Sequence, residues 1–142
     1  MSLYLYVIHS YIKIFTILFF YLFIFIYQQG MPGATHLRDS TDLKELLQHQ
    51  KSKGKFIAAI CAAPAVVLQS HGLLEGKAAT CYPVPKFTDS LALYRSDRVC
   101  VDGNVITSQG PATSLEFSLK LVEVLFGKKK ADDVGAEMLF VH

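Results

Sequence analysis

Apolar and polar positions alternate along the chain in a way that predicts several short elements. The clearest is an apolar run, Phe56–Ile60, which ends at Cys61 and is followed by small residues, Pro64 and a second apolar run. A buried strand that turns directly into a helix has this pattern. Pro64 suits the first turn of that helix, where its missing N–H leaves no hydrogen bond unmade. We therefore predict a strand over 56–60 and a helix that continues to about Ser70.

The remaining segments carry similar signals. Leucines at helical spacing follow Asp39 and Ser40, which both suit a helix cap. Asp102-Gly103-Asn104, between two β-branched runs, indicates a hairpin. The predicted elements are a helix from Asp39 or Ser40 to Lys53 with Leu43, Leu46 and Leu47 on one face, strands at Ala78–Cys81, Val99–Val101 and Val105–Thr107, a short helix or loop at Phe87–Tyr94, a long helix from a Ser114 cap to Gly127, and a short helix at about 131–137. Strands and helices that alternate before Pro83 argue for an α/β layer fold.

The first 29 residues differ from the rest in composition. Lys13 is their one charged residue, and phenylalanine, isoleucine, leucine and tyrosine dominate. The run is long enough for a helix to cross a bilayer core of roughly 30 Å at about 1.5 Å per residue, and its residue types also favour a strand. A third hypothesis is translated intron sequence, because such codons are rich in T and A and Gln29 can be encoded CAG. We weigh the intron above a membrane anchor, and a cleaved signal peptide fits less well because the start is not basic.

Composition limits the class of protein. A chain of 142 residues has room for one domain, and its 14 basic and 12 acidic residues form no basic stripe, so nucleic acid is not an expected partner. Three cysteines, Cys61, Cys81 and Cys100, without Cys-x-x-Cys spacing indicate a reducing compartment. Nothing in the sequence resembles a zinc site or a Walker loop, so we expect neither a metal nor a cofactor.

Cys61 is the residue with the most distinctive chemistry. At a strand-to-helix turn it would lie beside the positive end of the helix dipole, which favours the thiolate, the nucleophilic form. This geometry is similar to the nucleophile elbow of hydrolases, with sulfur in place of oxygen. The alternative is a small buried cysteine at a strand end, which is how most free cysteines behave. The local pattern leaves both interpretations open.

Four stretches, in chain order, resemble the ThiJ/PfpI superfamily, in the branch of the parkinsonism-associated deglycase and its plant homologues. They are Gly30–Asp39, Ala58–Pro64, His71–Lys77 and Val101–Phe117. The resemblance implies a partial flavodoxin-like α/β sandwich, of the class I glutamine amidotransferase-like type, usually assembled as a homodimer. It also implies an easily oxidised elbow cysteine and cofactor-free glyoxalase or deglycase chemistry on methylglyoxal or its adducts. The resemblance further implies chaperone and oxidative-stress roles and a cytoplasmic, nuclear or plastid location.

The resemblance also assigns roles to individual residues. Cys61 matches the family nucleophile, and the N–H groups of Gly30, in a glycine loop, and of Ala62 match the donors of an oxyanion hole. Tyr82 stands where the best-known members have a histidine near the cysteine. Gln109 replaces an arginine, which changes the anion-binding side of the pocket. The pocket candidates are Tyr82, His36 and Gln109.

The sequence departs from the family towards its N-terminal end. Family members begin with a βαβ portion whose glutamate hydrogen-bonds the cysteine, whereas no acidic residue precedes Asp39 here. We therefore expect an apolar segment over 1–29 and an N-terminally truncated domain over 30–142. Three functions remain: an impaired glyoxalase or deglycase acting on a small aldehyde or glycated adducts, a non-enzymatic redox sensor or chaperone-like protein, or a truncated gene product without function. Whether the chain is an enzyme stays open, and it would be membrane-anchored only if residues 1–29 span a bilayer.

Overall fold

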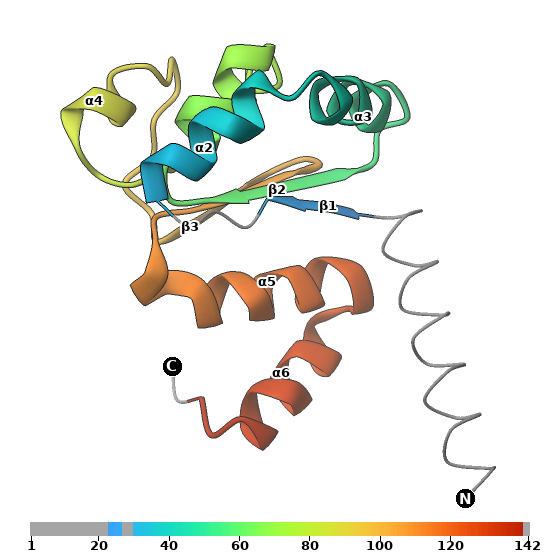
Figure 1. Cartoon of the computed structure of the whole chain (residues 1–142). Coiled ribbons are helices and arrows are strands. Elements are labelled where there is room, and N and C mark those ends of the chain that lie inside the picture. The colour runs from blue at the N-terminus through green and yellow to red at the C-terminus, as the bar shows by residue number, and fades with distance from the viewer. Residues whose placement is uncertain (1–22, 27–29, 141–142) are drawn as a thin grey trace, which may run out of the picture.

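The computed structural model of the chain describes residues 23–26 and 30–140. Within these residues, four strands form one sheet with helices on both of its faces (Figure 1). Three strands run parallel, and the fourth pairs antiparallel at one edge. In sheet order the strands are β1 (Phe23–Ile26), β2 (Phe56–Ile60), β4 (Val105–Ser108) and β3 (Val99–Asp102). The predicted α/β sandwich is therefore confirmed.

The helices divide between the two faces of the sheet (Figure 1). One face carries α2 (Gly30–Asp39), α3 (Thr41–Ser52), the π-helix η1 (Pro64–Leu68), the 3-10 helix η2 (Gln69–His71) and α4 (Pro85–Thr88). The other face carries α5 (Ser114–Phe126) and α6 (Lys128–Glu137), and a 3-10 turn, η3 (Pro111–Thr113), leads into α5.

Helix α3 begins where the sequence predicts. Ser40 is its N-cap, and the Ser40 Oγ accepts a hydrogen bond from the N–H of Leu43 at 3.2 Å. Such a bond satisfies one of the backbone donors that a helix start leaves without a partner. Leu47 is fully buried, whereas Leu46 is 45% exposed. The prediction that Leu46 shares the buried face is wrong, because the face of α3 that packs on the sheet is too narrow to bury all three leucines.

The predicted hairpin is present, and its turn is tied to β2. β3 and β4 pair antiparallel, and Gly103 in the turn has a φ of 59°, a left-handed conformation that glycine adopts without steric cost. The Asn104 side chain donates to the carbonyl of Lys55 at 2.8 Å. The Asn104 carbonyl accepts the N–H of Ile57, also at 2.8 Å. These two bonds align the start of β2 with the hairpin.

The prediction of a strand at Ala78–Cys81 is wrong. The segment forms an isolated bridge with Tyr94 and no regular ladder within the described residues. Side chains satisfy part of its backbone: the Asp102 carboxylate accepts the first N–H of the segment at 2.8 Å, and the Thr107 hydroxyl accepts that of Thr80 at 2.9 Å. Ala79 and Cys81 are buried as predicted, whereas Ala78 is only partly buried. Side-chain acceptors take the place of a neighbouring strand.

The cap predicted for α5 is also wrong. Ser114 is the first residue inside the helix, and Thr113 is the N-cap. The Thr113 hydroxyl does not bond to α5; it donates to the carbonyl of Gly110 at 2.9 Å within the preceding turn. The hydroxyl therefore closes η3, and the helix starts from that turn.

Two short helices begin earlier than predicted. α6 starts at Lys128 and not at about 131, because Gly127, with a φ of 87°, turns the chain sharply directly after α5. α4 starts at Pro85, whose fixed φ suits a first helical turn. In both cases a glycine or proline fixes the boundary more closely than the apolar pattern does.

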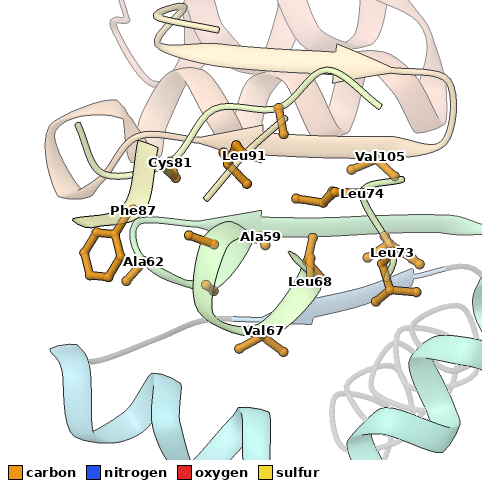
Figure 2. Close-up of a cluster of buried hydrophobic side chains, with 14 of the residues drawn as sticks. Ala59, Ala62, Val67, Leu68, Leu73, Leu74, Cys81, Phe87, Leu91 and Val105 are labelled. Carbon is orange, nitrogen blue, oxygen red and sulfur yellow. The ribbon is translucent and has the colours of Figure 1, made fainter. Parts of the chain in front are cut away.

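Among the described residues, the core consists of two unequal clusters. The larger one lies between the sheet and the first helical face (Figure 2). The cluster facing α5 contains Ala58, Ile60, Ile106 and Phe117. Leu121 and Leu125 of α5 pack against it but are only partly buried, and Phe126 is 58% exposed. The described residues therefore cover the apolar side of α5 incompletely.

Part of the N-terminal apolar segment lies in the sheet. β1 pairs in parallel with β2, with Phe23 opposite Phe56. Of the structures considered for the segment, a strand is therefore present over these four residues, while 1–22 and 27–29 lie outside the described residues. No helix in the described part of the chain is long and apolar enough to span a membrane.

Candidate active site

Cys61 directly follows β2 and is the residue at which the chain changes direction. Its φ of 66° lies in the left-handed region, which costs a residue with a side chain about 1–2 kcal/mol. Two backbone hydrogen bonds hold it there: its N–H donates to the carbonyl of Ser108 at 3.0 Å, and its carbonyl accepts the N–H of Tyr82 at 2.8 Å. The predicted strand-to-helix turn is therefore present. The role of Cys61 as a nucleophile stays a prediction.

The turn leads directly into a helix, as predicted. The N–H of Val66 donates to the carbonyl of Ala62 at 2.8 Å, so the first turn begins at Ala62. Pro64 opens η1, and the N–H of Gln69 donates back to its carbonyl. Wide π-type turns of this kind occur frequently at functional sites. Ala62 is buried, and its N–H as an oxyanion donor stays a prediction.

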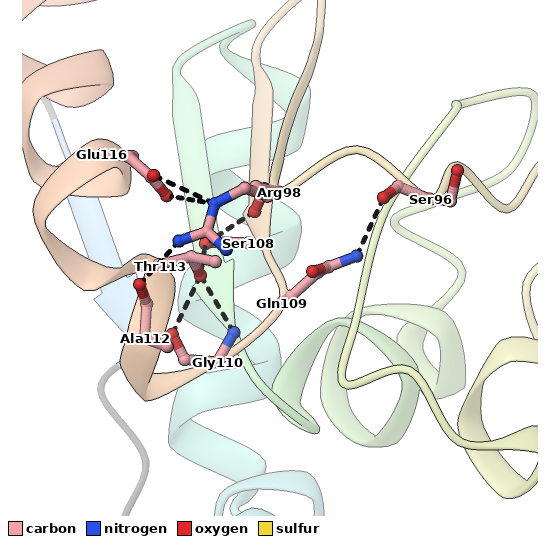
Figure 3. Close-up of polar contacts among 8 residues, drawn as sticks. All are labelled: Ser96, Arg98, Ser108, Gln109, Gly110, Ala112, Thr113 and Glu116. Carbon is pink, nitrogen blue, oxygen red and sulfur yellow. Dashed lines mark hydrogen bonds and ion pairs between the residues drawn. The ribbon is translucent and has the colours of Figure 1, made fainter. Parts of the chain in front are cut away.

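Tyr82 and Gln109 line a hollow next to this turn, which we call the Tyr82 hollow. Its lining residues are Tyr82, Pro83, Arg98, Gln109, Gly110, Pro111, Ala112 and Thr113. Tyr82 is 43% exposed. A Cβ atom on Gly110 would lie 3.4 Å from the Tyr82 Cδ2, so the ring packs over the glycine backbone. The Gln109 side-chain nitrogen donates to the carbonyl of Ser96 at 2.9 Å (Figure 3). Two of the three predicted pocket residues therefore come together.

Gly30 and His36 both lie on α2, which corrects the prediction of a glycine loop in this region. The segment is helical because Ala34 and Leu37 face the core at helical spacing: Ala34 is fully buried, and Leu37 packs against the larger cluster. Gly30 is the first residue of α2, so the N–H predicted to bind an oxyanion belongs to a helix start. His36 is exposed and does not line the Tyr82 hollow. α2 contacts η1, the helix after the turn.

A polar network that the sequence analysis missed fixes the segment between β4 and α5 (Figure 3). The Arg98 Nε donates to both carboxylate oxygens of Glu116 at 2.9 Å, and its Nη2 donates to the carbonyl of Ala112 at 2.8 Å. The hydroxyl oxygens of Ser108 and Thr113, both buried, lie 2.6 Å apart. The segment that follows β4 reads Gln-Gly-Pro-Ala-Thr-Ser, which contains no pattern that indicates this network.

The three cysteine thiols lie in different environments. Cys81 is fully buried, and this burial, together with the nearby Cys61, raises the pKa of its thiol to about 11. Burial also raises the pKa of Cys100, which packs in β3 as expected of a strand residue. Cys61 is partly exposed. It is therefore the thiol with the best access to a reagent.

The described residues give the Cys61 thiol no visible acid–base partner. The thiols of Cys81 and Cys100 donate to backbone carbonyls, and no hydrogen bond among the described residues joins the Cys61 thiol to a carboxylate. No group of three or more His, Cys, Asp or Glu residues in this part of the chain could hold a metal ion. The site therefore consists of a thiol on a strained turn beside a small hollow.

Comparison with known proteins places the chain in a family. Residues 29–124 match the model of the DJ-1/PfpI family. Protein DJ-1 homolog A of Arabidopsis thaliana is 46% identical over 112 residues, which are 78% of this chain and 29% of that protein. The glutathione-independent glyoxalase DJR-1.2 of Caenorhabditis elegans is 40% identical over 74% of this chain and 56% of that protein. The chain belongs to the DJ-1/PfpI family.

A solved structure shows the same fold. The oxidized DJ-1 of Toxoplasma gondii matches the chain with a TM-score of 0.76 and 47% identity, over 80% of this chain and 62% of that protein. The chain spans less than two thirds of the length of each of these relatives. The shared fold therefore covers only part of what a complete relative contains.

Proposed function

We propose that the chain carries cysteine-dependent aldehyde chemistry of the glyoxalase or deglycase type, with Cys61 as the nucleophile. The observation that carries the proposal is the position of Cys61, partly exposed on a strained strand-to-helix turn between the segments that line the Tyr82 hollow. A relative of 40% identity is named a glutathione-independent glyoxalase. Methylglyoxal or its adducts are therefore the first substrates to test.

The chemistry would begin with a covalent step. The Cys61 thiolate attacks the aldehyde carbon of methylglyoxal, a C–S bond forms, and the carbonyl π electrons move to oxygen to give a hemithioacetal. N–H groups of Ala62 and Gly30 would stabilise that oxygen. The hydrogen on the former aldehyde carbon then leaves as a proton and returns to the neighbouring carbon, which gives a thioester. Water hydrolyses the thioester, releases lactate and restores the thiol.

The proton transfer is the weak step in this chain. It needs a positioned acid–base group, and such groups typically contribute about 10²–10⁴-fold in rate. Among the described residues, no carboxylate forms a hydrogen bond with the Cys61 thiol. The Tyr82 hydroxyl, on a side chain that lines the adjacent hollow, is our candidate for a substitute. We therefore propose that residues 1–142 turn over methylglyoxal slowly.

Lactate formation from methylglyoxal tests this function. We expect a slow, Cys61-dependent rate that Cys61→Ser abolishes and Tyr82→Phe lowers further. Cys100→Ser is the matched control, because this thiol packs in β3 and lies outside the hollow. A rate that Cys61→Ser leaves unchanged would exclude Cys61 as the nucleophile. A rate equal to that of complete relatives would show that a substitute base is fully effective.

A redox function is the second candidate, and the state of Cys81 favours it. Peroxide oxidises a thiolate to sulfenic acid, and a second thiolate normally resolves that acid to a disulfide. Cys81 is fully buried and lies near enough to Cys61 for the charges of the two thiols to interact. The pKa of the Cys81 thiol is raised to about 11, so this thiol is rarely ionised at neutral pH. We expect oxidised Cys61 to proceed to sulfinic acid. Mass spectrometry after peroxide treatment would show this, and a Cys61–Cys81 disulfide would contradict it.

Assembly provides a test of the remaining alternatives. A homodimer is usual in the family that the sequence resembles, and we propose it for this chain. A truncated gene product without function, in contrast, should not give a stable, monodisperse species. Light scattering on the purified chain separates these outcomes, because a dimer, a monomer and polydisperse aggregates differ in mass.

A further inference from the structure

We infer that the hydroxyl pair of Ser108 and Thr113 positions Cys61, because it fixes the carbonyl that holds the Cys61 N–H. Within the described residues, no hydrogen bond joins either hydroxyl to the thiol, so both are positioning residues and not catalytic ones. That the positioned cysteine is a nucleophile rests on the proposed function. The positioning itself belongs to the backbone and can be measured without any turnover.

The conformation of Cys61 is unfavourable and is held from outside the residue. Its φ of 66° lies in the left-handed region, where a Cβ atom clashes with the backbone. The N–H of Cys61 donates to the carbonyl of Ser108 at 3.0 Å. Ser108 is the last residue of β4, where the sheet ends and the chain enters a turn. The strained turn therefore persists only if the end of β4 is held in place.

The two hydroxyls are buried and act as a unit. Ser108 is 0% and Thr113 2% exposed, and their oxygens lie 2.6 Å apart (Figure 3). The Ser108 Oγ also lies 3.0 Å from the carbonyl of Arg98, and the Thr113 Oγ1 lies 2.9 Å from that of Gly110. Two hydroxyl protons thus serve three short contacts. Removal of either hydroxyl leaves the other with fewer partners in a site that water does not reach, which is unfavourable.

The pair connects the end of β4 to two other parts of the fold. Thr113 is the N-cap of α5, so its side chain moves with the start of that helix. Its hydroxyl also accepts the N–H of Gly110 at 3.1 Å, which closes the turn between β4 and α5. Arg98, whose carbonyl contacts the Ser108 hydroxyl, directly precedes β3. Through Ser108, the N–H acceptor of Cys61 is therefore fixed to α5 and to the edge of the sheet.

Amide hydrogen exchange of the full chain measures this positioning at single residues. Mass spectrometry with fragmentation of the backbone resolves the Cys61 amide, and the Ile57 amide serves as an internal reference. Ile57 lies at the other end of β2, and its N–H donates to the carbonyl of Asn104 at 2.8 Å. A global loss of stability accelerates both amides, whereas a local opening of the turn accelerates only the Cys61 amide. The ratio of the two exchange rates therefore isolates the turn.

Thr113→Val should raise this ratio about tenfold, because the lost bonds change a local equilibrium by about this factor. Thr113→Ser is the matched control, since it keeps the hydroxyl and loses only a methyl group. It should leave the ratio near that of the unmodified chain. A ratio that Thr113→Val does not change, or that Thr113→Ser raises equally, would overturn the inference. So would a Cys61 amide that exchanges in the unmodified chain as fast as in an unstructured peptide, and this result needs no variant to fold.

Chemistry at the thiol separates positioning from simple access. Iodoacetamide needs only an exposed thiolate, whereas lactate formation from methylglyoxal also needs a fixed geometry. Thr113→Val should lower lactate formation about tenfold and change Cys61 alkylation less than twofold, and Thr113→Ser should restore both. Equal losses of the two rates in Thr113→Val would overturn the positioning role. The predicted exchange ratios without lactate formation in any variant would refute the proposed function and leave the positioning intact.

Discussion

The backbone N–H of Tyr82 donates to the carbonyl of Cys61 at 2.8 Å. This bond joins the strained turn to the segment that carries Tyr82, a side chain that lines the hollow. On the other side, the N–H of Cys61 is held by Ser108 at 3.0 Å. Because both backbone groups of the cysteine are engaged, the positive φ is imposed by the fold and does not depend on the side chain.

Access should set the order in which the three thiols react. Iodoacetamide at neutral pH should label Cys61 first, because Cys81 is fully buried with a pKa raised to about 11 and Cys100 is 8% exposed with its pKa also raised by burial. Peptide mass spectrometry at short times measures the order. Equal labelling of all three thiols in a folded sample would contradict the assignment of the turn.

Replacement of Cys61 by glycine should relieve the backbone of its strain. Glycine adopts a φ of 66° without the clash that a Cβ atom causes. We expect Cys61→Gly to be about 1 kcal/mol more stable than Cys61→Ala, which lacks the thiol but keeps the Cβ. Urea unfolding of the two variants gives the difference. An alanine variant of equal or greater stability would mean that the turn relaxes when the thiol is absent.

The hydroxyl of Thr113 should contribute to stability through its buried partners. It lies 2.6 Å from the Ser108 hydroxyl and 3.1 Å from the N–H of Gly110. Thr113→Val keeps the shape but leaves the N–H of Gly110 without this acceptor, while the Ser108 hydroxyl keeps only its bond to the carbonyl of Arg98. The loss should cost about 1–3 kcal/mol. The control is Ser118→Ala on the exposed side of α5, where we expect less than about 0.5 kcal/mol. Similar losses in thermal unfolding for both variants would refute the prediction.

His71 should make the fold sensitive to mild acid. Its Nε2 is buried without a partner, and burial, followed by the charge of Lys44, lowers its pKa from the ordinary 6.5. Below pH 6.5 the unfolded chain therefore takes up a proton that the folded chain resists, so stability falls as pH drops through this range. His71→Gln should show a smaller fall between pH 7 and about 5.5. If the stability of both chains depended on pH in the same way, the lowered pKa of His71 would not be the cause of the fall.

The strand β1 should stabilise the domain although its sequence is unlike the rest. It pairs in parallel with β2, so a chain that begins at Gly30 leaves one edge of β2 open. We expect that chain to melt lower and to bind more hydrophobic dye than one that begins at Phe23. Both should be more soluble than the full chain, which carries the apolar residues before Phe23 as well. Identical melting of the two shortened chains would show that β1 contributes nothing.

The sequence by itself determined several of the local elements and their order. The run Phe56–Ile60, the small residues after Cys61 and Pro64 were enough to predict a strand, a sharp turn and a helix start. Ser40 and Gly103 correctly marked a cap and a turn. These signals are local, because caps, turns and apolar periodicity depend on residues a few positions apart.

Only the tertiary structure decided what satisfies each backbone group and which side chains meet. The segment Ala78–Cys81 has the composition of a strand, yet the side chains of Asp102 and Thr107 accept its N–H groups in place of a strand. His36 and Gly30 lie on a helix and not in a loop, because that segment packs Ala34 into the core. The pairing of Arg98 with Glu116 joins the residue directly before β3 to α5. Such contacts depend on the position of distant segments in space, and no pattern of neighbouring residues encodes that position.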